Sequence, residues 1–194
     1  MAARLALFAY GSLVSPESAS ATLDRQFPAP IPARLPGWRR RWSLFRDNLA
    51  VEKTFARSDD GTVPQHVLGL NIEPSEIDSE APNGALLALS EDELLRLDVR
   101  EMRYDRVEVT EAVEHSAGFD RVFAYRGKRA QFAPRPPPGA VVIAAYVARV
   151  EAAFAALGQK QLRLYRETTG PPPVEVIEAR LVCDRIPPGN PRDW

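Results

Sequence analysis

The stretch of residues 4–13 constrains the fold of this chain more than any other part of the sequence. Residues 5–9 form an apolar run of the length of one buried strand, and Gly11 and Ser12 follow almost at once. Glycine allows a sharp turn there at little steric cost. A tight turn after a buried strand leaves several N–H groups without ladder partners, and such groups suit a carboxylate, a carbonyl oxygen or a phosphate. The alternative is an ordinary first strand with its turn.

The length of 194 residues suits a single domain with a sizeable core, so we expect one domain over residues 1–194. A formal net charge of −1 gives no electrostatic case for a nucleic-acid or anionic-membrane partner. No apolar run is long enough to span a bilayer, and the N-terminus lacks the cleavage region of a signal peptide. We therefore expect a soluble, cytoplasmic protein with no nucleic-acid and no membrane partner; the sequence does not give the oligomeric state.

Metal and cofactor motifs are missing from the sequence. Cys183 is the only cysteine, which excludes an internal disulfide and a zinc–thiolate cluster. His66 and His115 are the only histidines, and neither has a metal-ligand spacing. There is no Gly-x-Gly-x-x-Gly, P-loop or Gly-x-Ser-x-Gly motif, and Ser12 has no histidine near it in sequence to activate it. We expect no metal and no cofactor.

Hydrophobic periodicity indicates a mixture of strands and helices. Strands are predicted over residues 5–9, 33–46, 66–72, 83–89, 104–113, 121–126 and 174–186. Helices are predicted after Ser15 and over residues 90–98 and 140–157, with a further helical turn over 161–168. Residues 27–36 read as an extended connection or edge strand, and 47–64, 73–82 and 131–139 as loops. The pattern predicts an α+β fold with a small mixed or barrel-like sheet of about five to seven strands flanked by a few helices.

Two helix starts have specific signals. Ser15 can cap a helix whose first position is Pro16, and Ser90 with Glu93 forms a capping-box pattern. The basic cluster at residues 39–41 lies between two tryptophans, and we interpret it as a solvated strand edge.

Glu101 is the candidate for acid–base chemistry. It follows the helix predicted over residues 90–98 and precedes the strand predicted from Tyr104. Such a junction places a side chain at the end of a sheet, where sites tend to lie. Partial burial would raise the pKa of this carboxyl toward neutrality and let it transfer a proton. The alternative is a surface ion pair with a neighbouring arginine: Arg100, Arg103 or Arg106.

Two separated segments resemble the gamma-glutamylcyclotransferase family. The first is the apolar strand that runs into Tyr10-Gly11-Ser12-Leu13, and the second is residues 84–101, with their Leu-Asp-x-x-Glu ending, followed by Tyr104. The resemblance covers about residues 5–158, with smaller matching pieces at 35–38, 124–125 and 134–138. Leu13 departs from the family pattern, in which many members have asparagine, and residues 47–82 and those from 161 onward are unmatched.

The resemblance implies the fold of that family and its reaction, in which a gamma-glutamyl group cyclises to 5-oxoproline and releases the attached amine or amino acid. The substrate's own α-amine attacks, so neither a protein nucleophile nor a cofactor is needed. The partner is then a small-molecule gamma-glutamyl compound. The resemblance implies Glu101 as the catalytic base and then acid, and as substrate-binding residues Tyr10, Gly11, Ser12, Leu13, Tyr104 and Tyr125.

Several alternatives remain open at this point. Tyr104 and Tyr125 have core packing as an equal alternative to a substrate-orienting role, and we assign Tyr146 to the core and Asp98 to the helix end or an ion pair. The chain could be a non-catalytic small-molecule binding domain on the same fold. It could also be an interaction module, which would require an exposed aromatic patch at residues 38–42. The identity of the gamma-glutamyl compound is not given by the sequence.

Overall fold

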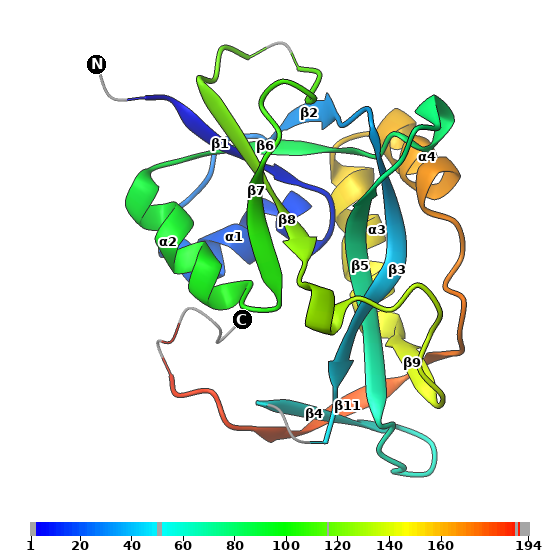
Figure 1. The fold of residues 1–194 in the computed structure, drawn as a ribbon. Helices are drawn as coiled ribbons and strands as arrows, with labels where there is room; N and C mark the ends of the chain where they lie inside the picture. The colour runs from blue at the N-terminus through cyan, green and yellow to red at the C-terminus, as the bar shows by residue number, and fades with distance from the viewer. Residues whose placement is uncertain (1–2, 50–51, 116, 189, 191–194) are drawn as a thin grey trace.

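The computed structural model describes residues 3–49, 52–115, 117–188 and 190. Over those residues the chain forms eleven strands in three sheets, together with four α-helices and three short 3-10 helices (Figure 1). Strands of both orientations occur in the two larger sheets. The predicted α+β fold with a mixed sheet is confirmed.

The first sheet has five strands and is built around the N-terminal run. The central strand β1 (Leu5–Ala9) is buried along its whole length. It pairs antiparallel with one neighbour and parallel with the other, so both of its edges are hydrogen-bonded, and its apolar side chains are buried on both faces of the sheet. The strand order is β2 (Ile31–Arg34), β6 (Asn83–Leu89), β1, β8 (Arg121–Gly127) and β7 (Tyr104–Glu108).

The second sheet has four strands and the third has two. The four run in the order β10 (Val176–Ile177), β9 (Ala140–Ile143), β5 (His66–Pro74) and β3 (Trp38–Asp47). The third sheet is the antiparallel pair β4 (Lys53–Arg57) and β11 (Ala179–Asp184). It lies below the other two in Figure 1 and faces the junction between α2 (Glu91–Arg100) and β7.

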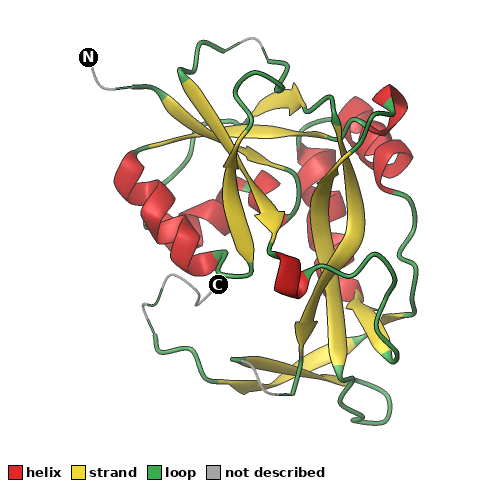
Figure 2. Cartoon of the chain, viewed as in Figure 1, coloured by secondary structure: helices red, strands yellow, loops and turns green. Residues whose placement is uncertain are grey.

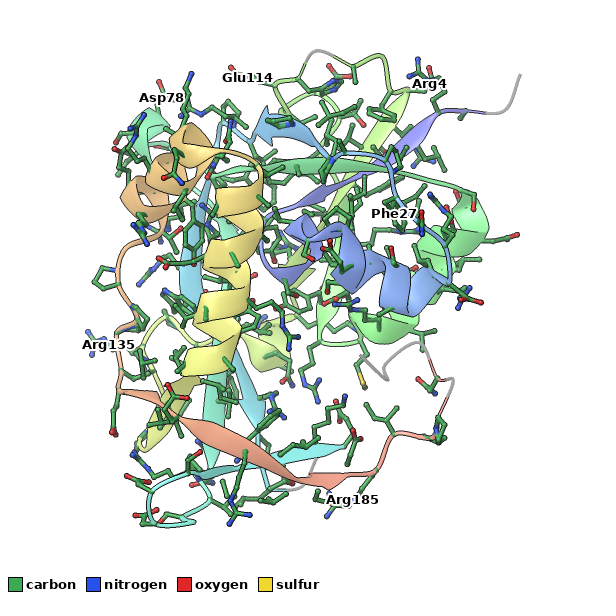
Figure 3. All side chains as sticks on the ribbon, turned by 180° about the vertical axis from the view of Figure 1, so that it is seen from behind. Arg4, Phe27, Asp78, Glu114, Arg135 and Arg185 are labelled. Atoms are coloured by element: carbon green, nitrogen blue, oxygen red, sulfur yellow. The ribbon has the colours of Figure 1, made fainter. Side chains whose placement is uncertain are left out.

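The helices form two pairs. On one side α1 (Pro16–Leu23) lies beside α2 (Glu91–Arg100), and on the other α3 (Ala144–Ala156) lies beside α4 (Gln159–Thr169) (Figure 2). Seen from behind, α1 and α3 cover the sheets, and side chains fill the interior beneath them (Figure 3). The 3-10 helices are η1 (Ser12–Val14), η2 (Asp78–Glu80) and η3 (Arg129–Gln131). No helix of the described residues is both long and apolar enough to cross a membrane.

Both helix-capping predictions are confirmed. Ser15 is the N-cap of α1, its side chain accepts a hydrogen bond from the amide of Ser18 at 3.4 Å, and Pro16 opens the helix. The capping box of α2 is complete: Ser90 Oγ accepts from the amide of Glu93, and the Glu93 carboxylate accepts from the amide of Ser90 at 2.8 Å. These local signals fix the first residue of α2. The length of the helix then sets the position of its C-terminal end.

Several parts of the predicted secondary structure were wrong. The strand predicted over residues 33–46 is interrupted between β2 and β3, and the strand predicted over 104–113 ends at Glu108. Residues 140–143 form strand β9 rather than the first turn of a helix, because a short apolar run has no periodicity that separates the two. The predicted loop at residues 47–64 contains β4, which is held by the distant strand β11. The predicted C-terminal strand divides into β10 and β11, which join different sheets. The expected strand number was consequently too low.

The interpretation of residues 39–41 as a solvated strand edge was also wrong at its middle residue. Strand β3 is an edge strand, but Arg40 is only 1 % exposed. Trp42 is buried, and Trp38 is half-buried against the core. The described structure therefore lacks the exposed aromatic patch that an interaction module at residues 38–42 would require.

Candidate functional site

The turn at residues 10–13 directly follows the central strand β1. The amide of Val14 donates to the carbonyl of Gly11 at 3.0 Å, which closes the first turn of η1. The first amides of a helix have no partner within it. Within the described structure, the amides of Ser12 and Leu13 donate to no backbone carbonyl. The 10–13 turn thus presents N–H groups of the kind that bind a carboxylate or stabilise an oxyanion.

Arg40 lies behind this turn and holds it. Its Nη1 donates to the carbonyl of Tyr10 at 3.1 Å and to that of Asn83 at 2.7 Å, while Nε donates to Thr169 Oγ1 at 2.7 Å. The guanidinium also lies over the ring of Tyr165, 4.5 Å from its centroid. Burial lowers the pKa of Arg40 to about 10, so the side chain stays charged at neutral pH. Arg40 forms no ion pair with a described residue, so its charge is satisfied by neutral acceptors.

Glu101 caps the C-terminal end of α2. Its amide donates to the carbonyl of Leu97 at 2.7 Å, and its carbonyl accepts from the amide of Tyr104 at 2.8 Å. These two bonds define the short turn between α2 and β7. The Glu101 side chain is only 17 % exposed. Burial raises the pKa of its carboxyl above 4.5, and the nearby charges of Arg100 and Arg103 act against that shift.

The ion pair between Arg100 and Glu101 connects this end of α2 to α1. Arg100 Nε lies 3.1 Å from Glu101 Oε1. The same guanidinium donates to Ser18 Oγ and Thr22 Oγ1 of α1, each at 2.8 Å. Arg100 is therefore fixed from two directions, and it fixes the Glu101 carboxylate in turn. The sequence left two interpretations of Glu101, a partly buried acid or a surface ion pair with an arginine. In the structure its carboxyl is both largely buried and paired with Arg100.

Glu101 and the 10–13 turn line one small cavity of about 40 Å³, which we call the inner cavity. It is bordered by all four residues of the turn and by Leu70, Tyr104, Tyr125 and Tyr146. The structure thus brings every sequence-predicted site residue to a single hollow. These residues come from the end of β1, the end of α2, the start of β7 and the strand β8.

A larger cavity of about 350 Å³, the outer cavity, adjoins the inner one. Glu101, Tyr104 and Tyr146 line both. The outer cavity extends from them toward β3, β4 and α3, where its walls include Arg46, Phe55 and Arg149. A further hollow of about 710 Å³ shares Glu52 and Arg103 with it but contains neither Glu101 nor the turn. The inner and outer cavities together are therefore the candidate site.

The tyrosines of the site have different partners. The Tyr104 hydroxyl donates to the carbonyl of Leu70 at 2.9 Å, and the Tyr125 hydroxyl donates to Asp98 Oδ1 at 2.9 Å. Tyr125 therefore orients Asp98 at the helix end rather than Glu101. The Tyr10 hydroxyl donates to the carbonyl of Tyr125 at 2.5 Å. Burial raises the pKa of all three phenols, so each stays protonated at neutral pH and acts as a donor.

Tyr146 is the site residue that the sequence interpretation missed. It was assigned to the core because it shares the apolar face of the predicted helix, and it does pack against core residues. The structure also places it on both cavities. A Cβ atom added to Gly11 would lie 3.3 Å from the Tyr146 hydroxyl oxygen, which shows how close the phenol comes to the turn. The signal available in sequence was the polar tip of a tyrosine on an otherwise apolar face.

The described part of the chain contains no candidate metal site. No group of three or more His, Cys, Asp or Glu side chains there is arranged to hold a metal ion. The polar groups that line the candidate site are two carboxylates, several phenols, four arginines, one lysine and backbone amides. That set is suited to hydrogen bonding and proton transfer.

Comparison with known proteins gives a result at the level of fold. No family model and no curated protein sequence matches the chain. A solved structure of an uncharacterized Homo sapiens protein is 17% identical and has a TM-score of 0.58, and the match covers 91% of this chain and 95% of that one. A structure described as a gamma-glutamyl cyclotransferase is 17% identical over 90% of this chain and 94% of that one, with a TM-score of 0.57.

A third structure is a yeast gamma-glutamyl cyclotransferase described as specific to glutathione. It is 15% identical, and the match covers 86% of this chain and 96% of that one at a TM-score of 0.52. Identities this low show a shared fold and leave activity open. The chain has the gamma-glutamyl cyclotransferase-like fold, as its sequence resemblance implies.

Proposed function

We propose that this protein is a cofactor-independent cyclotransferase that converts a gamma-glutamyl compound to 5-oxoproline and releases the attached amine or amino acid. One observation carries the proposal: Glu101 and the 10–13 turn, far apart in sequence, line the same inner cavity. A proton-transferring carboxylate and a set of N–H donors on one small hollow are the two elements that this acyl transfer needs. The fold shared with gamma-glutamyl cyclotransferases supports the same activity.

Glu101 takes the role of base and then acid. The α-ammonium of the substrate must lose a proton before its nitrogen attacks the γ-carbonyl carbon. The Glu101 carboxylate accepts that proton and returns it to the departing nitrogen as the original amide bond breaks. Burial favours this role, because it raises the pKa of the Glu101 carboxyl and brings it nearer to neutral pH.

The 10–13 turn supplies donors to the substrate. When the α-nitrogen attacks, the γ-carbonyl oxygen becomes an oxyanion, and amides such as those of Ser12 and Leu13 stabilise that charge. Tyr104 and Tyr146, which line both cavities, hold the glutamyl part folded back on itself, and orientation of this kind lowers the barrier to ring closure. Tyr125 takes part in substrate binding through its place on the inner cavity.

The inner cavity is small, and this decides where the rest of the substrate lies. Its volume of about 40 Å³ is close to that of one water molecule, about 30 Å³ in the liquid. It therefore holds the reacting atoms, and the remainder of the substrate occupies the outer cavity. We place this activity in the cytoplasm, in keeping with a sequence whose single cysteine cannot form an internal disulfide.

The test is release of 5-oxoproline from a panel of gamma-glutamyl compounds by wild-type protein and by Glu101→Gln. The panel contains gamma-glutamyl amino acids, glutathione and gamma-glutamyl amines. Wild-type protein should release 5-oxoproline from at least one compound, and the variant should do so about 10²–10⁴-fold more slowly while keeping the wild-type circular dichroism spectrum. Equal turnover by both proteins would remove Glu101 from the reaction. Binding of a panel compound without any release would favour the non-catalytic binding domain instead.

A further inference from the structure

Arg100 is a buried cation that the proposed mechanism does not use. Its side chain is fully buried, and its guanidinium contacts two elements at once, the Glu101 carboxylate at the end of α2 and the polar side of α1. Burial of a charge costs free energy unless that charge is paired and hydrogen-bonded, so we examine what these contacts do for the site. The inference below rests on the proposed function and concerns how its acid is placed.

Helix α1 is joined to the 10–13 turn by backbone hydrogen bonds. The amide of Ser15 donates to the carbonyl of Ser12 at 3.2 Å, which completes the 3-10 helix η1. The amide of Ala19 then donates to the carbonyl of Ser15 at 3.4 Å, which opens α1. Helical hydrogen bonds of this kind make a stiff element. A side chain that is bound to α1 is therefore held at a fixed place relative to the turn.

Three hydrogen bonds attach Arg100 to α1. Its Nη1 donates to the carbonyl of Ser18 at 2.5 Å and to Thr22 Oγ1 at 2.8 Å, and its Nη2 donates to Ser18 Oγ at 2.8 Å. Ser18 and Thr22 lie one helical turn apart, so their polar groups are neighbours on one face of α1. The donors of a guanidinium form a rigid planar fork that matches such a face, whereas a lysine ammonium is a single point of charge.

The third nitrogen of the same guanidinium lies against the acid. Arg100 Nε is 3.1 Å from Glu101 Oε1. One rigid group therefore contacts both the carboxylate and the helix that follows the 10–13 turn. Since Glu101 and the turn line the inner cavity together, Arg100 connects the two halves of the proposed machinery, the acid and the N–H donors. Rotation of the carboxylate away from its present place would break the ion pair.

Arg100 also influences the charge state of Glu101. Burial raises the pKa of this carboxyl, and the charge of Arg100, followed by that of Arg103, acts against the increase. Arg149 on α3 repels Arg100 in turn. Four phenols that stay protonated at neutral pH also face the carboxylate, from the end of β1 and from β7, β8 and α3: Tyr10, Tyr104, Tyr125 and Tyr146. Loss of the Arg100 charge should therefore favour the protonated form of Glu101.

We propose that Arg100 is a positioning residue of the reaction: through α1 it holds Glu101 at a fixed place relative to the 10–13 turn. The acid must reach the α-nitrogen while the turn holds the γ-carbonyl oxygen, so the relative placement of the two governs ring closure. Loss of the clamp should act on kcat more than on KM, because the placement matters most in the transition state. The charge of Arg100 adds a second effect, on the pH at which Glu101 becomes a base.

The experiment separates the two effects with Arg100→Lys and Arg100→Met, assayed on the best compound of the panel. Arg100→Lys keeps a charge beside Glu101 but loses the fork of contacts to α1. Its kcat should fall about tenfold or more with KM close to wild type, and the acid limb of its kcat/KM profile should keep the wild-type midpoint. Arg100→Met removes the charge as well, so kcat should fall and the midpoint of the acid limb should move to higher pH.

Arg96→Met is the matched control. Arg96 is another arginine of α2 that donates to α1, to the carbonyl of Thr22 at 2.6 Å and to that of Leu23 at 3.3 Å, but it lines neither cavity. Its loss should weaken the packing of the two helices and leave both kcat and the acid midpoint at wild-type values. Wild-type kcat in Arg100→Lys, or a wild-type midpoint in Arg100→Met, would overturn the clamp.

Thr22→Val covers the case in which Arg100→Met does not fold. This nearly isosteric change keeps Arg100 and removes one of its acceptors on α1. We expect kcat to fall about threefold or more, the loss of one hydrogen bond, at an unchanged acid midpoint. Wild-type kcat in this variant would also overturn the clamp.

Failure of the proposed function gives a different result from failure of the clamp. If no compound of the panel releases 5-oxoproline, the cyclotransferase proposal fails, and the Glu101 carboxyl is then titrated directly by NMR in isotope-labelled protein. A carboxyl pKa that is higher in Arg100→Met than in wild type, and unchanged in Arg96→Met, would support the hold of Arg100 on Glu101. The same pKa in all three proteins would refute it.

Discussion

Nη1 of Arg40 lies 3.1 Å from the carbonyl oxygen of Tyr10, the first residue of the turn that faces Glu101. A peptide group is planar, so a hydrogen bond that fixes this carbonyl also fixes the amide of Gly11 on the opposite side. The turn is therefore oriented from behind by a buried cation that does not reach the cavity itself. Arg40 is a positioning residue in the proposed reaction.

Arg40→Met should lower the free energy of unfolding much more than the same substitution at the neighbouring Arg41. The substitution leaves the carbonyls of Tyr10 and Asn83 without a donor, at about 1–3 kcal/mol for each buried group. Urea denaturation should show a loss of roughly 3 kcal/mol or more. Arg41→Met, at a half-buried position beside it where the side chain is 42 % exposed, should stay within about 0.5 kcal/mol of wild type. Equal losses in the two variants would contradict the prediction.

Gly84→Ala should disrupt the strand pair that carries the turn. A Cβ atom at this position would lie 2.2 Å from the carbonyl oxygen of Ala9 and 2.8 Å from the Phe8 ring, and backbone must move to admit it. We expect a loss of about 3 kcal/mol or more in the free energy of unfolding. Gly69→Ala is the control, because its nearest neighbours would be at an ordinary 3.8 Å. A thermal melt that shows similar midpoints for both variants would refute the argument.

The pH dependence follows from the raised pKa of Glu101. If this carboxylate is the base, kcat/KM should fall tenfold per pH unit on the acid side, with its midpoint above 4.5. The free energy of unfolding should respond to the same carboxyl in the opposite direction: it should fall, not rise, as the pH increases through the pKa of Glu101. A carboxyl whose pKa is raised on folding stabilises the folded state while protonated, and this contribution is lost as the pH rises through the folded-state pKa.

The difference in unfolding free energy between Glu101→Gln and wild type should therefore grow from about pH 4 to pH 7, because glutamine stays neutral. Urea denaturation at several pH values measures it, and the rate profile of wild-type protein measures the acid limb. A difference that shrinks as the pH rises would mean that the pKa of Glu101 is lowered on folding.

Tyr146→Phe should impair turnover without affecting the fold. The phenol lines both cavities, so loss of its hydroxyl should lower kcat/KM by about tenfold. The free energy of unfolding should change by less than about 1 kcal/mol. Tyr165→Phe makes the same change at a buried tyrosine of α4 that lines neither cavity, and it should keep wild-type turnover. A purely structural Tyr146 would leave kcat/KM unchanged.

Local features of the candidate site could be predicted from sequence because their causes lie within a few residues. The apolar run of β1, the glycine turn after it and the capping box at Ser90 each depend on neighbouring positions. The position of Glu101 at the end of a helix followed from the same signals. The resemblance of two segments to one family then predicted that the two halves of the site meet.

The remaining features depend on contacts that no local pattern encodes. The sequence around Arg40 is typical of a surface strand, and the residue is buried only because Asn83, Tyr165 and Thr169 surround it in the fold. Likewise, the sequence of β4 is typical of a loop, and it forms a strand because β11 pairs with it. The same holds for Tyr146, whose helix period fits a core position as well as a cavity wall. The sequence by itself determined the local elements and the acid at a helix end. Only the tertiary structure decided that Arg40 is buried behind the turn and that Tyr146 joins the site, because both depend on packing between segments far apart in the chain.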